Sequence, residues 1–211
     1  MRNDSPTPAA GNRRRVLLAT ALLIVVLLAG LGFWAFRSSG EASVAVPARV
    51  CDGSLPGSAV RPLLPEQGEG FKEELYGYRG SGAATVQGRC TLTGGGRTVQ
   101  IVHSLILHPS DSVRTKIAEE IERPGNTAIH LGEASGYATP GAIYLFLDCR
   151  APEGDHLVRV TTGLGGSDQP LKDRATMERV AGLTADAARS VAPRIDTCEA
   201  DRLPGGAPTL G

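Results

Sequence analysis

The sequence predicts an α+β domain, with an antiparallel sheet and helices packed on one face, preceded by one transmembrane helix. Three observations lead to this prediction. An uncharged apolar run fills residues 16–36, several later segments are apolar at every second position, and residues near the C-terminal end are apolar at every third or fourth position. Period two is typical of half-buried strands and period 3.6 of a helix with one apolar face. Successive strands joined by short turns pair antiparallel.

The apolar run has the length of a membrane anchor. Residues 16–36 carry no charge, and Thr20 is their only polar side chain. As a helix they span roughly 30 Å, the thickness of the hydrocarbon core of a bilayer. A secretory signal has a shorter apolar region, about 7 to 15 residues, so cleavage after Ser43-Val44-Ala45 is the weaker interpretation. A buried core helix is weaker still, because the run has no polar face.

The flanking arginines predict the orientation of the anchor. Arg13, Arg14 and Arg15 precede the run, and Arg37 alone follows it. The positive-inside rule keeps the arginine cluster in the cytoplasm and places the later residues outside. We therefore expect a single-pass cell-membrane protein that contacts the lipid bilayer through this helix. The expected parts are a cytoplasmic tail (1–15), the anchor (16–36), a tether (37–49), an extracytoplasmic α+β domain (50–202) and a disordered tail (203–211).

The composition of the outer part limits its partners. Residues 41–211 hold 17 basic and 21 acidic side chains, so no excess of positive charge remains outside the membrane. We therefore expect no nucleic-acid partner. About 150 residues also suffice for one domain with a substantial core.

The N-terminal half of the domain contains a short helix and a hairpin. Ser54 is a candidate cap for a helix over 56–64, and a glycine-rich loop covers 68–82. Residues 83–93 alternate as a strand does, Gly94-Gly95-Gly96 permits a turn, and 97–108 alternates again. Glycine reaches positive φ without steric cost, so these two strands are expected to form an antiparallel hairpin.

Helices and two further strands follow. Ser110 is a candidate cap for a helix that Pro124-Gly125 ends, and strands are expected over 142–149 and 156–162. Ser167 and Asp168 are candidate caps for a final long helix that Pro193 ends. Its apolar stripe is Met177, Val180, Leu183, Ala187 and Val191. One helix near each end and one between the strands suggest a sheet with helices on one face.

Few residues suggest chemistry. His103 shares a strand face with Val99 and Ile101, which fits either a base in a pocket or, as we favour, a hydrogen-bonded core histidine. The four cysteines are too far apart in sequence for the close pairs that zinc sites use, so we expect no metal and no other cofactor. Tyr76, Tyr78 and Arg79 lie on the glycine-rich loop, which is either a recognition loop or, as we favour, a plain surface loop.

The cysteines are expected to form disulfides. All four (Cys51, Cys90, Cys149 and Cys198) follow the anchor, so they lie outside the cell, where disulfides persist, and their number is even. Four cysteines allow three pairings. Cys90 and Cys149 both lie on apolar strand faces, so a Cys90–Cys149 bridge with Cys51–Cys198 is feasible on the residues alone.

The spacing of the first two cysteines resembles a known type of envelope protein. Cys51-Asp-Gly-Ser-Leu-Pro precedes the short helix, Val60-Arg-Pro-Leu-Leu-Pro ends it, and Gly88-Arg-Cys90 lies in the next strand. This layout is similar to that of actinobacterial secreted or membrane-tethered envelope proteins of unknown function, with a lipoprotein-like domain and paired cysteines. The resemblance covers residues 50–200. It implies the sequential pairing Cys51–Cys90 and Cys149–Cys198, and it assigns no catalytic residue.

Two functions remain open after these observations. We expect a non-catalytic extracytoplasmic domain that binds an envelope ligand, either a small molecule or a protein partner, and that is not an enzyme. The alternative is an envelope hydrolase with an unrecognised active site near His103.

Overall fold

The computed structural model describes residues 43–80, 83–149, 154–165, 171, 173–195, 198 and 203–211. The predicted cytoplasmic tail (1–15) and anchor (16–36) lie outside the described residues. In the part of the chain that is described, no helix has the length and apolar character needed to cross a membrane.

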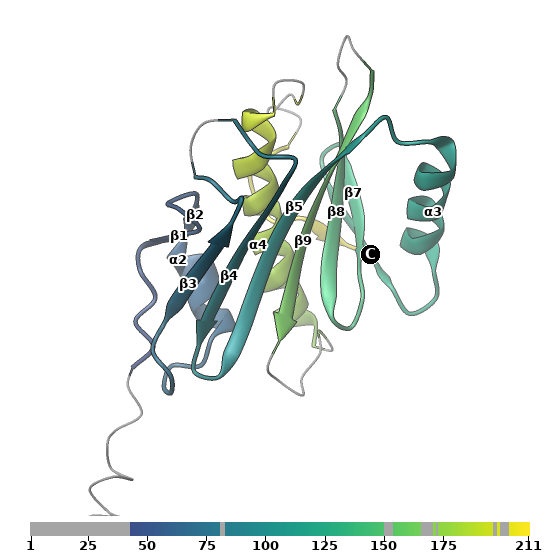
Figure 1. Ribbon diagram of the computed structural model, residues 1–211. Coiled ribbons are helices and arrows are strands. Elements are labelled where there is room, and N and C mark those ends of the chain that lie inside the picture. The colour runs from purple at the N-terminus through teal and green to yellow at the C-terminus, as the bar shows by residue number, and fades with distance from the viewer. Residues whose placement is uncertain are drawn as a thin grey trace, which may run out of the picture. The chain divides into compact units, whose positions relative to one another are not determined.

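The domain is built on an eight-stranded sheet in which every neighbouring pair is antiparallel (Figure 1). The spatial order is β10-β6-β7-β8-β9-β5-β4-β3. A separate hairpin pairs β1 (Arg49–Val50) with β2 (Leu55–Pro56). The predicted α+β class with an antiparallel sheet is therefore confirmed. The eight strands are β3 (Lys72–Tyr76), β4 (Gln87–Gly94), β5 (Arg97–Leu107), β6 (Thr127–Leu131), β7 (Ala134–Ala138), β8 (Ala142–Cys149), β9 (His156–Gly165) and β10 (Thr209–Leu210).

The central hairpin forms as the sequence predicts. β4 and β5 pair from Gly94↔Arg97 to Gln87↔Ser104, and Gly95 and Gly96 make the turn with φ of 58° and 76°. The first strand begins at Gln87 instead of residue 83. The preceding segment turns away from the sheet, because the Ala84 amide donates to the carbonyl of Arg194 at 2.9 Å.

One face of the sheet, here called the core face, is covered by α4 (Arg174–Val191), which passes behind the strands in Figure 1. The N-cap is Asp173, whose carboxylate accepts from the Thr176 amide at 2.7 Å. Ser167 and Asp168, the predicted caps, lie outside the described residues. The apolar stripe of α4 packs on inward side chains of β5, β8 and β9. Its buried residues are Val180, Ala181, Leu183, Thr184, Ala185, Ala187, Ala188 and Val191.

The prediction that all helices pack on one face is wrong. α3 (Asp111–Glu122) lies beside Phe146 and Leu157, whose side chains point away from the core face because neighbours such as Leu147 and Val158 point into it. We call this opposite side the outer face. Strand alternation thus supplies a second apolar surface, which α3 covers: Phe146 and Leu157 are buried, whereas no residue of α3 itself is.

Both ends of the described domain differ from prediction. Residues 43–49 are not a free tether, since Val44 and Val46 are buried and Ser43 bridges to Gln67. Nor are residues 203–211 a disordered tail: Leu203 is buried, and β10 pairs with β6. In both cases a few apolar side chains attach the end of the described domain to its core.

The predicted helix over 56–64 is shorter and composite. α2 (Gly57–Val60) continues into the 3₁₀ helix η1 (Arg61–Leu63), where Pro62 cannot donate an amide to the α-helical pattern. Ser54 does not cap it, because its hydroxyl donates to the Cys51 carbonyl. A second 3₁₀ helix, η2 (Ala192–Arg194), extends α4 and contains Pro193, as expected for its end.

Two disulfides connect these parts. Cys51 is bonded to Cys90 and Cys149 to Cys198, with Cα–Cα distances of 5.6 Å and 4.6 Å. This is the sequential pairing that the resemblance implies, and the rival Cys90–Cys149 bridge is excluded. The first bond joins the β1–β2 turn to β4, and the second joins β8 to the segment after α4.

Candidate functional site

His103 lies inside the core, as its strand face predicts. Its side chain is 1% exposed, and its Nε2 lies 3.1 Å from the carbonyl oxygen of Thr85. Since a carbonyl only accepts, Nε2 carries the proton and donates, which leaves Nδ1 as an acceptor. Nδ1 is buried and has no hydrogen-bond partner in the described chain. A side chain enclosed in this way does not reach a substrate.

The surroundings of His103 keep it neutral. Tyr78 packs edge-on at 5.3 Å between ring centroids, and the Arg194 guanidinium lies 5.9 Å from the centre of the Tyr78 ring. Burial lowers the pKa of His103; the hydrogen bond to Thr85 opposes this shift, and the positive charge of Arg194 adds to it. Burial also raises the pKa of Tyr78. A neutral histidine and a neutral tyrosine thus pack beside the Arg194 guanidinium at the end of α4.

Two of the other histidines lie together at one end of the sheet. His108 and His156 meet edge-to-face at the end of the β5–β9 pair, with ring centroids 5.5 Å apart. The sequence does not reveal this contact, since 48 positions separate the two residues and only the strand pairing joins them. Among the described residues, no group of three or more His, Cys, Asp or Glu side chains is arranged to hold a metal ion.

The three residues of the glycine-rich loop do not act together. Tyr76 belongs to β3 and is 68% exposed, Tyr78 is in the core at 3%, and Arg79 is exposed beyond the strand. Strand alternation alone would place Tyr76 and Tyr78 on the same face; they separate because β3 ends at Tyr76 and Gly77, with φ of 60°, turns the chain inward. No shared apolar groove is formed by Tyr76 and Tyr78.

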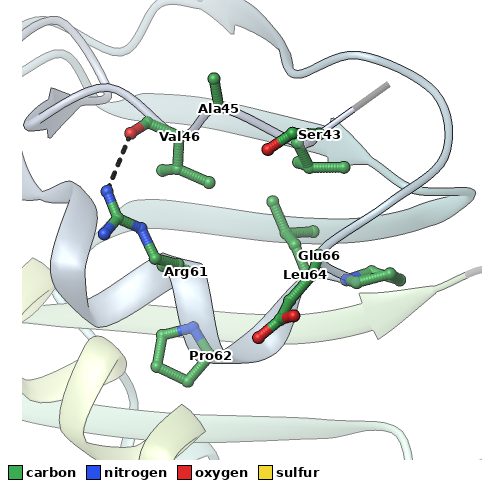
Figure 2. A pocket seen from close by; sticks show the side chains of 9 residues that line it. Ser43, Ala45, Val46, Arg61, Pro62, Leu64 and Glu66 are labelled. Atoms are coloured by element: carbon green, nitrogen blue, oxygen red, sulfur yellow. Dashed lines mark hydrogen bonds between the residues drawn. The ribbon is translucent and has the colours of Figure 1, made fainter. Parts of the chain in front are cut away.

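A pocket of about 660 Å³ lies where the described domain begins (Figure 2). Its walls are the segment 43–46 and the segment from η1 to Glu66. The Arg61 guanidinium crosses between them and donates to the Val46 carbonyl at 3.4 Å, as Figure 2 shows. The charged group of Arg61 is thus hydrogen-bonded to the protein's own main chain. We therefore interpret the pocket as the space beneath residues 43–46, where the described domain begins.

The outer face carries a more distinctive set of side chains. Strand register aligns six residues, one from each of β7, β8, β9, β5, β4 and β3, in a single row across the sheet. In order they are Tyr137, Tyr144, Thr161, Val102, Arg89 and Tyr76. A parallel second row contains Phe146, Arg159, Ser104 and Gln87. We call these ten residues the tyrosine–arginine face.

Contacts within the tyrosine–arginine face hold its aromatic rings in place. Tyr137 stacks on Tyr144 with centroids 4.9 Å apart and on Phe146 at 6.1 Å. At the other end the Arg89 guanidinium lies 5.6 Å from the centre of the Tyr76 ring. Cross-strand pairs of this kind stabilise a sheet and fix ring orientation. The rings are therefore positioned before any ligand arrives.

The polar groups of the face are also held. Arg159 Nε donates to the Ser104 hydroxyl at 3.2 Å. Burial and the nearby Glu120 carboxylate raise the pKa of Tyr137, with a further contribution from Tyr144, against the opposing effect of Arg159. Tyr137 therefore keeps its phenolic proton at neutral pH and remains a hydrogen-bond donor.

Sequence reasoning missed most of this face. Tyr76 was singled out, but as a loop residue, and the other nine members were not singled out as site residues. Their odd–even positions identify them as the outward side of their strands, and that signal was present in the sequence. The order of the strands was not, so the rows could not be assembled. Comparisons with known proteins add no assignment: no family model, no curated protein and no solved structure matches this chain.

Proposed function

We propose that the protein is a membrane-anchored extracytoplasmic domain that binds an envelope ligand on its tyrosine–arginine face and catalyses no reaction. The observation that carries the proposal is the row from Tyr137 to Tyr76, whose side chains are all at least partly exposed; of the ten residues of the face only Phe146, beside α3, is buried. Tyrosine and arginine are the residue types that concentrate binding energy at recognition surfaces. A preformed, uncovered row of them needs little reorganisation to bind.

In this proposal the predicted membrane anchor determines on which side of the membrane the domain lies. Residues 1–15 remain in the cytoplasm, 16–36 cross the bilayer and the described domain lies outside, as the arginine asymmetry favours. The described domain begins at Ser43, and six residues (37–42) separate it in sequence from the predicted anchor. Six residues reach at most about 20 Å. The domain is then held close to the outer surface of the membrane.

The hydrolase alternative has less support. It needs His103 as an accessible base, whereas His103 is 1% exposed and donates through Nε2 to a main-chain carbonyl. We therefore favour binding over catalysis.

Co-sedimentation with envelope fragments tests the proposed function. The full chain, purified in detergent, is mixed with insoluble envelope fragments from the cells that make it. We expect binding that falls at least tenfold in Thr161→Glu, which places a carboxylate in the middle of the row, and in Tyr76→Ala. Ala175→Glu adds the same charge at an exposed position of α4 and serves as the matched control. Equal binding by all variants, or no binding by the wild type, would refute the proposal.

A further inference from the structure

We infer that the ligand of the tyrosine–arginine face is an acidic polysaccharide; this inference rests on the proposed function. The tyrosine–arginine face differs in charge from the rest of the domain. The ten residues of the face include Arg89 and Arg159 and no carboxylate, although the chain from residue 41 onward carries more acidic than basic side chains. The face is thus locally positive on an acidic domain, and it favours an anionic ligand.

Nearby carboxylates do not cancel this charge. Glu120 on α3 is paired with Arg123 at 2.5 Å, and Asp148 on β8 is paired with Arg114. Glu74 lies two positions before Tyr76 on β3, on the same side of the sheet and one row away from Arg89, so this single carboxylate stands against the two arginines of the face. The positive charge of Arg89 and Arg159 is therefore not neutralised by these carboxylates. Guanidinium groups bind the carboxylate or phosphate of a ligand with directed hydrogen bonds.

The remaining side chains match the surface of a sugar. Between the tyrosines and Arg89 lie the small residues Thr161 and Val102, and the second row adds the hydroxyl of Ser104 and the amide of Gln87. Aromatic rings have negative faces that attract the weakly positive C–H groups of a pyranose ring, while hydroxyls and amides bond its hydroxyls. Tyrosine, phenylalanine and arginine are also enriched at protein–protein interfaces, so a protein ligand is one of the outcomes that the experiment distinguishes.

The spacing of the arginines predicts the length of the ligand. Arg89 and Arg159 stand two strands and one row apart, which corresponds to about 12 Å between their Cα atoms from standard sheet spacings. One sugar ring does not bridge that distance. Affinity should therefore rise with chain length until the oligosaccharide reaches both arginines, and then level off.

Direct titration of the full chain in phosphatidylcholine nanodiscs tests this inference, with empty nanodiscs as the blank. Polygalacturonate oligomers are the acidic probe, dextran is the neutral one, and polyglutamate supplies the same charge without sugar rings. We expect polygalacturonate to bind at least tenfold more tightly than either, and both Arg89→Gln and Tyr76→Ala to weaken it at least tenfold. Arg179→Gln, an exposed arginine on α4, should change affinity less than twofold.

Several results would overturn the inference. Equal binding of dextran, equal binding of polyglutamate, or no binding of polygalacturonate each contradicts it. The envelope assay separates this failure from failure of the proposed function. If envelope binding still depends on Thr161 and Tyr76 but is lost after protease treatment of the fragments and survives periodate oxidation of their sugars, the ligand is a protein. The proposed function then stands and the polysaccharide inference falls.

Discussion

His103 fits inside the core because its partner on β4 is Gly88. A Cβ atom at position 88 would lie 2.3 Å from His103 Cε1 and 2.9 Å from the Gly77 carbonyl oxygen. The first contact could be relieved by movement of the imidazole, but the second is with main chain. Thus the space that accepts the ring exists only while residue 88 has no side chain.

Gly88→Ala is therefore expected to lower the free energy of unfolding by about 1–3 kcal/mol, as overpacking does. In urea unfolding, the double variant Gly88→Ala/His103→Ala should recover part of the free energy of unfolding that Gly88→Ala alone loses, because the ring that the added methyl group meets is gone. Gly182→Ala is the matched control: it lies within α4 with nothing within 4 Å of the added Cβ. Alanine favours helix over glycine, so this variant should gain about 0.5–1 kcal/mol. A neutral Gly88→Ala would contradict the packing described above.

The same histidine should make stability depend on pH. Its pKa in the folded protein is lowered by burial, whereas the unfolded chain takes up a proton near the ordinary value. The contribution of neutral His103 to the free energy of unfolding is therefore fully present above about pH 6.5. It decreases as the pH falls from there towards the lower pKa of the folded protein. Urea unfolding between pH 8 and 5 should show this loss in the wild type and a smaller one in His103→Gln, whose amide can still donate to Thr85. Identical pH profiles would show that His103 is not the group responsible.

At the scale of elements, the disulfides attach polar segments to the sheet. The β1–β2 turn, held by Cys51–Cys90, also receives hydrogen bonds: Asp52 donates its amide to Glu73 at 3.0 Å and accepts from the Gly80 amide at 2.8 Å. Cys198 performs the same task for the segment after α4, which the bond to Cys149 ties to β8.

Removing either disulfide should therefore be costly. The bonded residues are 39 and 49 positions apart, and closure of loops of that size contributes about 4 kcal/mol in the chain-entropy model. We expect Cys51→Ala with Cys90→Ala, and separately Cys149→Ala with Cys198→Ala, to lower the free energy of unfolding by about that amount. Mass mapping of unreduced peptides checks the pairing itself. A peptide that joins Cys90 to Cys149 would contradict it.

For the whole molecule, the attachment of residues 43–46 bears on how the chain is processed. Val44 and Val46 are buried, and the Val44 amide donates to the Glu66 carbonyl at 2.9 Å. A signal peptidase that cut after Ala45 would remove part of this segment from the domain. The packing of the folded domain thus favours retention of the N-terminal region.

We expect the protein in membranes to be uncleaved, with its N-terminus inside. Intact mass should include residues 1–46, and protease added to cells without an outer barrier should digest the domain while sparing an N-terminal tag. The control is the same digestion after lysis, when the tag must disappear. A mature protein that begins near Pro47 would replace the anchor with a cleaved signal.

Local sequence determined the elements whose side chains alternate strongly. The β4–β5 hairpin, β8, β9 and the stripe of α4 were all predicted, because their inward residues are large and apolar. β7 escaped prediction since its inward residues are Ala134, Gly136 and Ala138, which leave no apolar period. A Cβ at Gly136 would lie 1.9 Å from the Tyr144 carbonyl oxygen, so close backbone approach sets that choice. β3 escaped because an edge strand remains polar.

Only the tertiary structure decided how these elements were combined. Three features depend on neighbours that are far away in sequence. They are the face of the sheet on which α3 packs, the burial of Tyr78 while Tyr76 is exposed, and the attachment of both ends of the described domain. The tyrosine–arginine face is the clearest case: Tyr76, Arg89 and Tyr137 lie in one row because strand order and register bring them together. Local periodicity states which way a side chain points from its own strand. It contains no information on which strand lies alongside, and the order of neighbouring strands is what brings separate residues together on one surface.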